Sequence, residues 1–144
     1  MRTFYLFEVK DNIIKNYRNN YEELYTMLEN IHHLKTEDIV LGYSIFNSIV
    51  MPLKKDDYNE YVKQNNLDNE NYICYNYTHT INDFYFNEST KMIINNSHIK
   101  IKTNKNVPSF FYNIRNFKNI FVCDFNNHDY FLLEDTIYSS CITS

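Results

Sequence analysis

The sequence predicts a single α+β domain, in which an N-terminal strand and several helices precede a mainly antiparallel sheet with one further helix. The main observation is a change of period. Apolar residues recur at helical spacing through most of the first half of the chain and in short strand-like runs through the second half. In addition, the 144 residues include one Gly and two Pro, and no linker or repeat divides them. A chain of this length can bury one core, so we expect residues 1–144 to form one domain.

The first predicted strand covers residues 4–9. Almost every side chain in this segment is apolar or aromatic. Such a run is typical of a strand that is covered on both faces. We therefore expect it to pair in the same sheet as the strands of the second half.

Two helices follow this strand. The first is predicted over residues 11–18, and either Asp11 or Asn12 can cap it, because a side-chain oxygen there accepts a hydrogen bond from the first turn. The second is predicted over residues 21–28, with Asn20 as its cap.

The first helix carries more large apolar residues than so short a helix can bury on one face. Ile13 and Tyr17 are four residues apart and share a face, whereas Ile14 lies about 100° away from Ile13. If Ile14 packs inward, Ile13 and Tyr17 face outward and form a binding surface. The alternative is that both are ordinary core residues.

A longer helix is predicted over residues 36–51. Thr36 is its expected cap, acidic residues occupy its first turn, and Pro52 ends it. A polar helix over residues 56–63 follows, and residues 64–71 read as a polar loop.

The second half of the chain is rich in short apolar segments bounded by Asn and Ser, which is typical of strands joined by turns. One of them, residues 98–102, alternates isoleucines with His and Lys, as in a half-exposed strand. The predicted strands cover residues 72–77, 91–94, 98–102, 119–125 and 128–133.

Two local features complete this half. A helix is predicted over residues 107–117, with Pro108 in its first turn. The last two strands form a hairpin that turns at Asn126 and Asn127, because Asn tolerates the left-handed backbone of tight turns. The tail after Asp135 is small and polar, so we expect it to fray.

Charge and cysteine content exclude several protein classes. The net charge of −4 and the pI of 5.7 disfavour direct nucleic-acid binding, although Lys100, Lys102, Lys105 and Lys118 form a small basic cluster. No apolar run reaches the roughly 20 residues of a membrane span, and no secretion signal is recognisable. Three widely spaced cysteines predict reduced thiols and a cytoplasmic protein without disulfides.

No metal or cofactor site is predicted. His32 and His33 are adjacent, but neighbouring helical side chains point about 100° apart and rarely bind one ion. His79, His98 and His128 are isolated, and no Cys/His ligand spacing is present. A single Gly within a predicted helix also excludes a glycine-rich phosphate loop.

One catalytic arrangement remains open. Cys123 precedes Asp124, and His128 across the hairpin turn would be the base that activates the thiol. Cys123 lies in an apolar strand, where a thiol is usually packed and inert. We therefore expect Cys123 to be structural and the Asp124 carboxylate to cap the turn.

Two stretches resemble a known family. Residues 3–17 run from an aromatic strand into an acidic-capped helix with Tyr17 in its last turn, and residues 121–126 read Phe-Val-Cys-Asp-Phe-Asn before the last strand. Both are similar to the sporulation inhibitor of replication family, SirA. The resemblance implies a small cytoplasmic regulator that is not an enzyme.

The resemblance also implies a partner and a surface. Members of the family bind the N-terminal domain of the replication initiator DnaA and restrain initiation as cells enter sporulation. Two aromatic positions four apart on their first helix contact the initiator, and these align with Ile13 and Tyr17. The neighbouring helix would supply Ser44 and Ser48 as the rim, on a protein that is monomeric before it binds.

Two other function classes stay open at this level. One is a hydrolase or transferase whose site is formed by residues distant in sequence. The other is a nucleic-acid-binding module that uses the edge at residues 100–105. A deep pocket with converging polar groups would favour the enzyme, whereas an exposed apolar patch at Ile13 and Tyr17 would favour the regulator.

Overall fold

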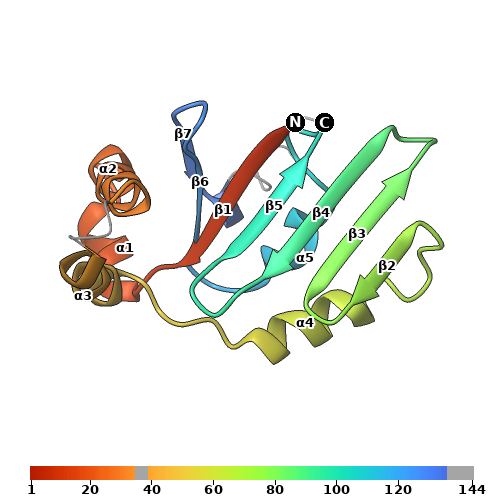
Figure 1. The fold of residues 1–144 in the computed structure, drawn as a ribbon, viewed down its shortest axis with the longest axis horizontal. Helices are drawn as coiled ribbons and strands as arrows, with labels where there is room; N and C mark the ends of the chain where they lie inside the picture. The colour runs from red at the N-terminus through yellow and green to blue at the C-terminus, as the bar shows by residue number, and fades with distance from the viewer. Residues whose placement is uncertain (35–38, 136–144) are drawn as a thin grey trace.

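The computed structural model of the chain describes residues 1–34 and 39–135. Within this part, seven strands form one antiparallel sheet in the order β2-β3-β4-β5-β1-β6-β7 (Figure 1). The strands are β1 (Arg2–Glu8), β2 (Tyr72–Tyr75), β3 (Thr78–Asp83), β4 (Glu88–Ile94), β5 (Ile99–Thr103), β6 (Ile120–Asp124) and β7 (Asp129–Leu132). The helices are α1 (Asp11–Tyr17), α2 (Tyr21–His32), α3 (Ile39–Ile49), α4 (Lys55–Gln64) and α5 (Phe111–Ile114). The predicted α+β class is confirmed.

The first strand lies inside the sheet, between β5 and β6. Phe4 and Leu6 are buried in the core on one face, and Phe7 is buried in the core on the other. This alternation confirms that the segment is covered on both faces. It also confirms the expected pairing of the first strand with strands from the second half of the chain.

One face of the sheet is covered by α4 and α5. Tyr58 and Val62 of α4 and Phe111 of α5 are buried in a core with Phe4 and Met92. The polar helix predicted over residues 56–63 is therefore present, and its few apolar side chains are the ones that pack inward.

The other face is covered by α1, α2 and the end of α3, which gather at the β6–β7 end of the sheet (Figure 1). Ile14 of α1 and Leu24 and Leu28 of α2 pack there against Phe121 and Cys123 of β6. Among the described residues, this core includes no side chain of β2–β5.

The strand β3 is absent from the sequence prediction, and β4 begins three residues before the predicted start. In β3, His79 and Ile81 are buried and alternate with half-exposed threonines. A buried histidine does not count as apolar in a sequence pattern, so the alternation was hidden. Asn76, with φ 54°, provides the left-handed turn that ends β2 earlier than predicted.

The predicted helix over residues 107–117 is wrong in length, because only Phe111–Ile114 forms α-helix. Beyond it, the chain turns through hydrogen bonds between residues three apart, such as the bond from Phe117 N–H to the Ile114 carbonyl. The Asn116 side chain also donates to the carbonyls of Tyr112 and Asn113. Asn side chains that bind nearby carbonyls compete with the helical pattern, which accounts for the short element.

Helix ends differ from prediction where tertiary contacts intervene. Lys10, not Asp11 or Asn12, is the N-cap residue of α1, and it makes no side-chain cap bond. Asn20 caps α2 as predicted, by accepting from Glu23 N–H. The predicted cap Thr36 lies outside the described residues.

The third helix ends at Ile49, before the predicted end at residue 51. Val50 leaves it to form a bridge with Val9, and Met51 N–H donates to the Glu8 carbonyl at 2.8 Å. Pairing with the end of the first strand therefore ends this helix ahead of Pro52.

Candidate functional site

The candidate site is α1 with its neighbours α2 and α3 (Figure 1). The start of α1 is fixed to the end of α3, because Lys10 N–H donates to the Ile49 carbonyl at 2.9 Å. Val9 and Val50 pair beside this bond. The helix is thus held on a rigid frame of strand and helix backbone rather than on a free loop.

The burial of α1 follows its sequence pattern. Ile14 is 3% exposed and packs into the core beneath the helix. Ile13 and Tyr17 are each partly exposed and pack against the same core at its border. The side chains of this pair are therefore neither free in solvent nor fully part of the core.

Tyr17 is positioned by α2. Its hydroxyl lies 4.0 Å from the Met27 sulfur, a long contact to a weak acceptor. One part of the ring packs on the core and the rest is accessible. A partner can therefore contact this ring without the ring having to leave its place in the fold.

The two serines named as a rim lie on α3. Ser44 and Ser48 are both exposed, and the Ser48 hydroxyl donates to the Ile45 carbonyl at 2.6 Å. Ser48 is next to Ile49, whose carbonyl receives the bond from Lys10. Ser48 is thus beside the start of α1, whereas Ser44 lies one helical turn earlier in α3.

Charged groups surround the helix. The Asp11 carboxylate lies 2.9 Å from Lys15 Nζ and 3.5 Å from Lys118 Nζ, and it accepts from the Asn119 side chain. Hydrogen bonds from Lys15 and Asn119 lower the Asp11 pKa to about 2. Arg18 is exposed beside them, so α1 presents an apolar strip flanked by charges of both signs.

The catalytic arrangement is not formed. Cys123 is fully buried, and burial raises the pKa of its thiol, which is the opposite of what a nucleophile needs. His128 instead lies 2.9 Å from Glu22 and packs against the Tyr25 ring. Among residues 1–34 and 39–135, no cluster of three or more metal-ligating side chains occurs.

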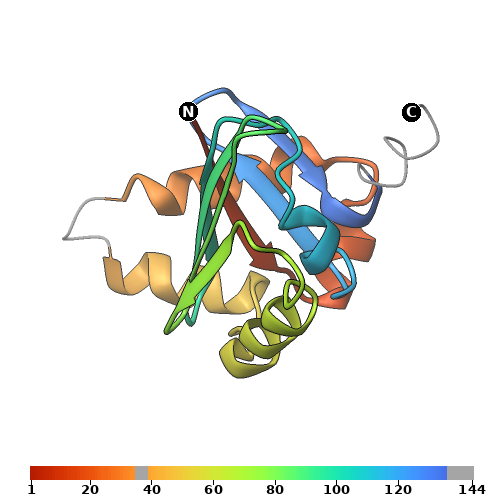
Figure 2. The same cartoon turned by 90° about the vertical axis from the view of Figure 1, so that its right-hand side faces the viewer.

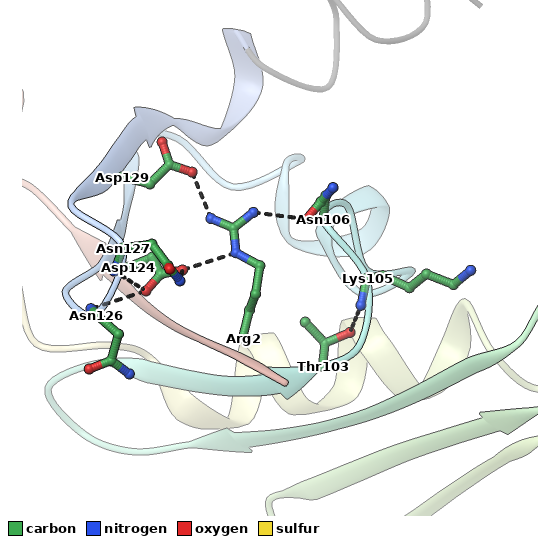
Figure 3. A network of polar contacts seen from close by, with 8 residues as sticks. All are labelled: Arg2, Thr103, Lys105, Asn106, Asp124, Asn126, Asn127 and Asp129. Carbon is green, nitrogen blue, oxygen red and sulfur yellow. Dashed lines mark hydrogen bonds and ion pairs between the residues drawn. The ribbon is translucent and has the colours of Figure 1, made fainter.

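The Asp124 carboxylate caps the turn, as predicted. It accepts from the backbone N–H groups of Asn126 and Asn127, each at 3.2 Å, and from the Asn127 side chain at 2.7 Å. The left-handed residue of this turn is His128, with φ 49°, rather than either asparagine. Arg2 adds a bond to Asp124 that local sequence could not indicate (Figure 3).

The basic cluster is divided in space. Lys118 pairs with Asp11 beside α1, whereas Lys100 and Lys102 lie on β5. Lys91 of β4 is directly opposite Lys102 and was missing from the sequence cluster. The alternation of buried and exposed residues along β4 would have placed Lys91 on the exposed side, but the predicted strand began only at Lys91.

No described helix is long and apolar enough to cross a membrane. No curated protein matches the chain significantly. The family model of the sporulation inhibitor of replication protein SirA, in contrast, matches residues 2–136. This match covers both stretches that carry the resemblance and nearly all of the described fold. The chain therefore belongs to the SirA family, whose members are non-enzymatic regulators that inhibit DnaA-dependent initiation of replication.

Proposed function

We propose that this protein binds the N-terminal domain of DnaA through α1, with Tyr17 as the anchor, and so restrains initiation during sporulation. Family membership supports the initiator as the partner. The observation that supports α1 as the surface is the half-exposed pair Ile13 and Tyr17 above a fully buried Ile14. In this proposal the protein acts in the cytoplasm and is a monomer before it binds.

A half-buried tyrosine is a suitable anchor. Binding energy in interfaces is concentrated in a few residues, and Tyr is among the commonest of them. Because the core already restricts the Tyr17 ring, little side-chain entropy remains to be lost on binding. Ile13 offers a smaller aliphatic contact on the same face, and we assign Ser44 and Ser48 to the polar rim.

Replacing Tyr17 with alanine is expected to weaken binding to the isolated DnaA N-terminal domain by about 2 kcal/mol, roughly 30-fold in Kd. Ile13→Ala should cost less, about 1 kcal/mol, because it removes less contact area. Isothermal titration of the full chain with the host's own domain measures both.

Tyr112→Ala is the matched control for this experiment. Tyr112 is an exposed tyrosine on α5, on the other face of the sheet, so its loss should leave the affinity unchanged. A thermal melt accompanies each variant. If Tyr17→Ala lowers the melting temperature sharply but binds as the parent does, then Tyr17 is a core residue and the proposed surface is wrong.

A further inference from the structure

The sheet has a second surface, formed by β2–β5 on the side that faces away from α4 and α5. In β4 and β5, Met92, Ile99 and Ile101 point into the core under α4 and α5. The residues between them therefore point to the opposite side, where α3 also lies (Figure 2). Lys91 and Lys102 are exposed there and Lys100 is half-exposed. We call this surface the basic face.

Positive charge is concentrated on the basic face. Lys91 is directly opposite Lys102, and Lys100 is opposite Ile93 on the adjacent pair. Among the described residues, no ion pair includes any of these three lysines. Like charges directly opposite each other destabilise a sheet, so this arrangement is unfavourable unless an anion relieves it.

The acidic residues of the same strands lie on the other side. Glu88 is buried and bound by the Thr90 and Ser109 hydroxyls. Asp83 accepts from the backbone N–H groups of Tyr85 and Phe86 in the turn after β3. In a chain of net charge −4, the strands thus separate their charges by face.

Lys100 also affects the pKa values of two neighbouring histidines, His98 and His32. Burial lowers the pKa of His98, and Lys100 and His32 lower it further. Burial is also the main cause that lowers the pKa of His32, and the charges of His33 and Lys100 lower it further. The charge of Lys100 thus acts on the pKa of both histidines, while Glu29 of α2 acts in the opposite direction on His32.

The basic face is also apolar in part. Ile73 and Tyr75 of the edge strand β2 are 67% and 77% exposed. They are paired with Thr80 and Thr78, whose neighbours on β4 are Lys91 and Ile93. Two rows of residues thus cross the sheet, each combining an exposed apolar residue with a lysine.

An apolar pocket of about 330 Å³ adjoins the basic face. It lies between α2, α3, β1 and the turn before β5, and its walls include Phe7, Leu28, Tyr43 and Phe46. Tyr5 lines the pocket and pairs with Lys100, whose Nζ lies 5.7 Å from the Tyr5 ring centroid. The basic face and the pocket are therefore continuous through Tyr5.

We propose that the basic face and the adjoining pocket together bind an acidic polypeptide segment that carries one large apolar side chain. The carboxylates of the segment lie against Lys91, Lys100 and Lys102, and its apolar side chain occupies the pocket beside Tyr5. Charge complementarity selects the acidic residues, and the apolar walls of the pocket select the anchor. This site shares α2 and α3 with the candidate DnaA surface but contains no residue of α1, and it does not depend on the proposed DnaA contact.

The chemistry of the surface favours a polypeptide over a nucleic acid. Three lysines on a protein of net charge −4 offer few phosphate contacts, and phosphate contacts dominate nucleic-acid affinity. Tyr75 offers one exposed ring, whereas Ile73 and Ile93 are aliphatic, so these cross-strand rows lack the successive aromatic platforms on which bases stack. A pocket lined by aliphatic and aromatic side chains is typical of sites for a hydrophobic anchor.

Selection of phage-displayed random dodecapeptides on the full chain tests the proposal. Selected peptides are expected to be rich in Asp and Glu and to share a large apolar residue. For synthetic copies of these peptides, Lys91→Gln combined with Lys102→Gln should raise Kd at least tenfold at low salt. Tyr43→Ala, which removes an exposed wall of the pocket, should raise it several-fold.

Lys54→Gln combined with Lys63→Gln is the matched control, because it removes the same charge from the α4 side of the sheet. It should leave peptide binding unchanged, as should Tyr17→Ala. Selection without acidic enrichment, or equal binding by the Lys91 and Lys102 double variant, would overturn the proposal. So would tighter binding of a mixed-sequence single-stranded oligonucleotide than of the selected peptides, which would make the face a nucleic-acid site.

Discussion

Replacing Asp124 with alanine is expected to lower the free energy of unfolding by about 3 kcal/mol or more, the largest effect of any single substitution considered for this chain. The carboxylate is fully buried and lies 2.9 Å from Arg2 Nε. It also accepts from two backbone N–H groups of the hairpin turn. Its removal leaves these donors without their partner and breaks an ion pair in which the carboxylate is buried and Arg2 is partly exposed. Urea denaturation of the parent and the variant measures the difference.

Asp129→Ala is the control for that substitution. Asp129 binds the same guanidinium, at 2.7 Å from Arg2 Nη2, but its side chain is 46% exposed (Figure 3). Exposed ion pairs contribute at most about 1 kcal/mol, so this variant should remain close to the parent. Equal losses for the two variants would show that the turn bonds of Asp124 contribute nothing beyond the ion pair.

Stability is also expected to fall by about 3 kcal/mol as the pH is lowered from 6.5 to 4, because of His79. The ring is fully buried, with Nδ1 2.6 Å from the Tyr72 hydroxyl and Nε2 2.6 Å from the Asn59 side-chain oxygen. A neutral ring with its proton on Nε2 satisfies both neighbours. Burial, and then the charge of Lys63, lower its pKa to about 4.

The direction of this effect follows from proton binding. The unfolded chain takes up a proton on His79 near pH 6.5, whereas the folded chain resists it until about pH 4. The contribution of neutral His79 to the free energy of unfolding is therefore complete above about pH 6.5. It is lost as the pH falls from 6.5 to about 4. Asp11 has a folded pKa of about 2, below its ordinary value of 3.8. Its contribution to stability is therefore lost only at lower pH, as the pH falls from 3.8 to about 2.

Denaturation between pH 7 and 4, with nuclear magnetic resonance titration of the ring, tests this prediction. A His79→Gln variant should lose much of the pH dependence in this range. His32 and His98, whose pKa values are also lowered by burial, add a contribution of the same sign. A His79 ring that titrates near pH 6.5 would contradict the prediction.

Local patterns in the sequence were sufficient for much of the fold. The apolar run of the first strand, the Asn20 cap and the polar helix over residues 56–63 were all recognisable, because each depends on neighbouring residues. The same holds for the turn at Asp124, whose carboxylate binds N–H groups two and three residues further along. These elements are stabilised by contacts that their own segments contain.

The elements that were missed depend on distant partners. β3 is recognisable only when His79 is known to be buried, and α3 ends where Val50 meets Val9. α5 is short because the Asn116 side chain binds two of its carbonyls, which a pattern of apolar residues does not register. In each case a tertiary or side-chain contact outweighs a local preference.

For the candidate site, the sequence alone determined that Ile13 and Tyr17 share a face that Ile14 does not, since this follows from helical geometry. Only the tertiary structure decided that the pair is half-buried, because the core beneath it is supplied by α2, β6 and β7. It likewise brought Lys91 opposite Lys102 and joined Arg2 to Asp124 across 122 residues of sequence. Periodicity fixes which residues of one segment lie together, whereas the packing of segments distant in sequence fixes what covers them.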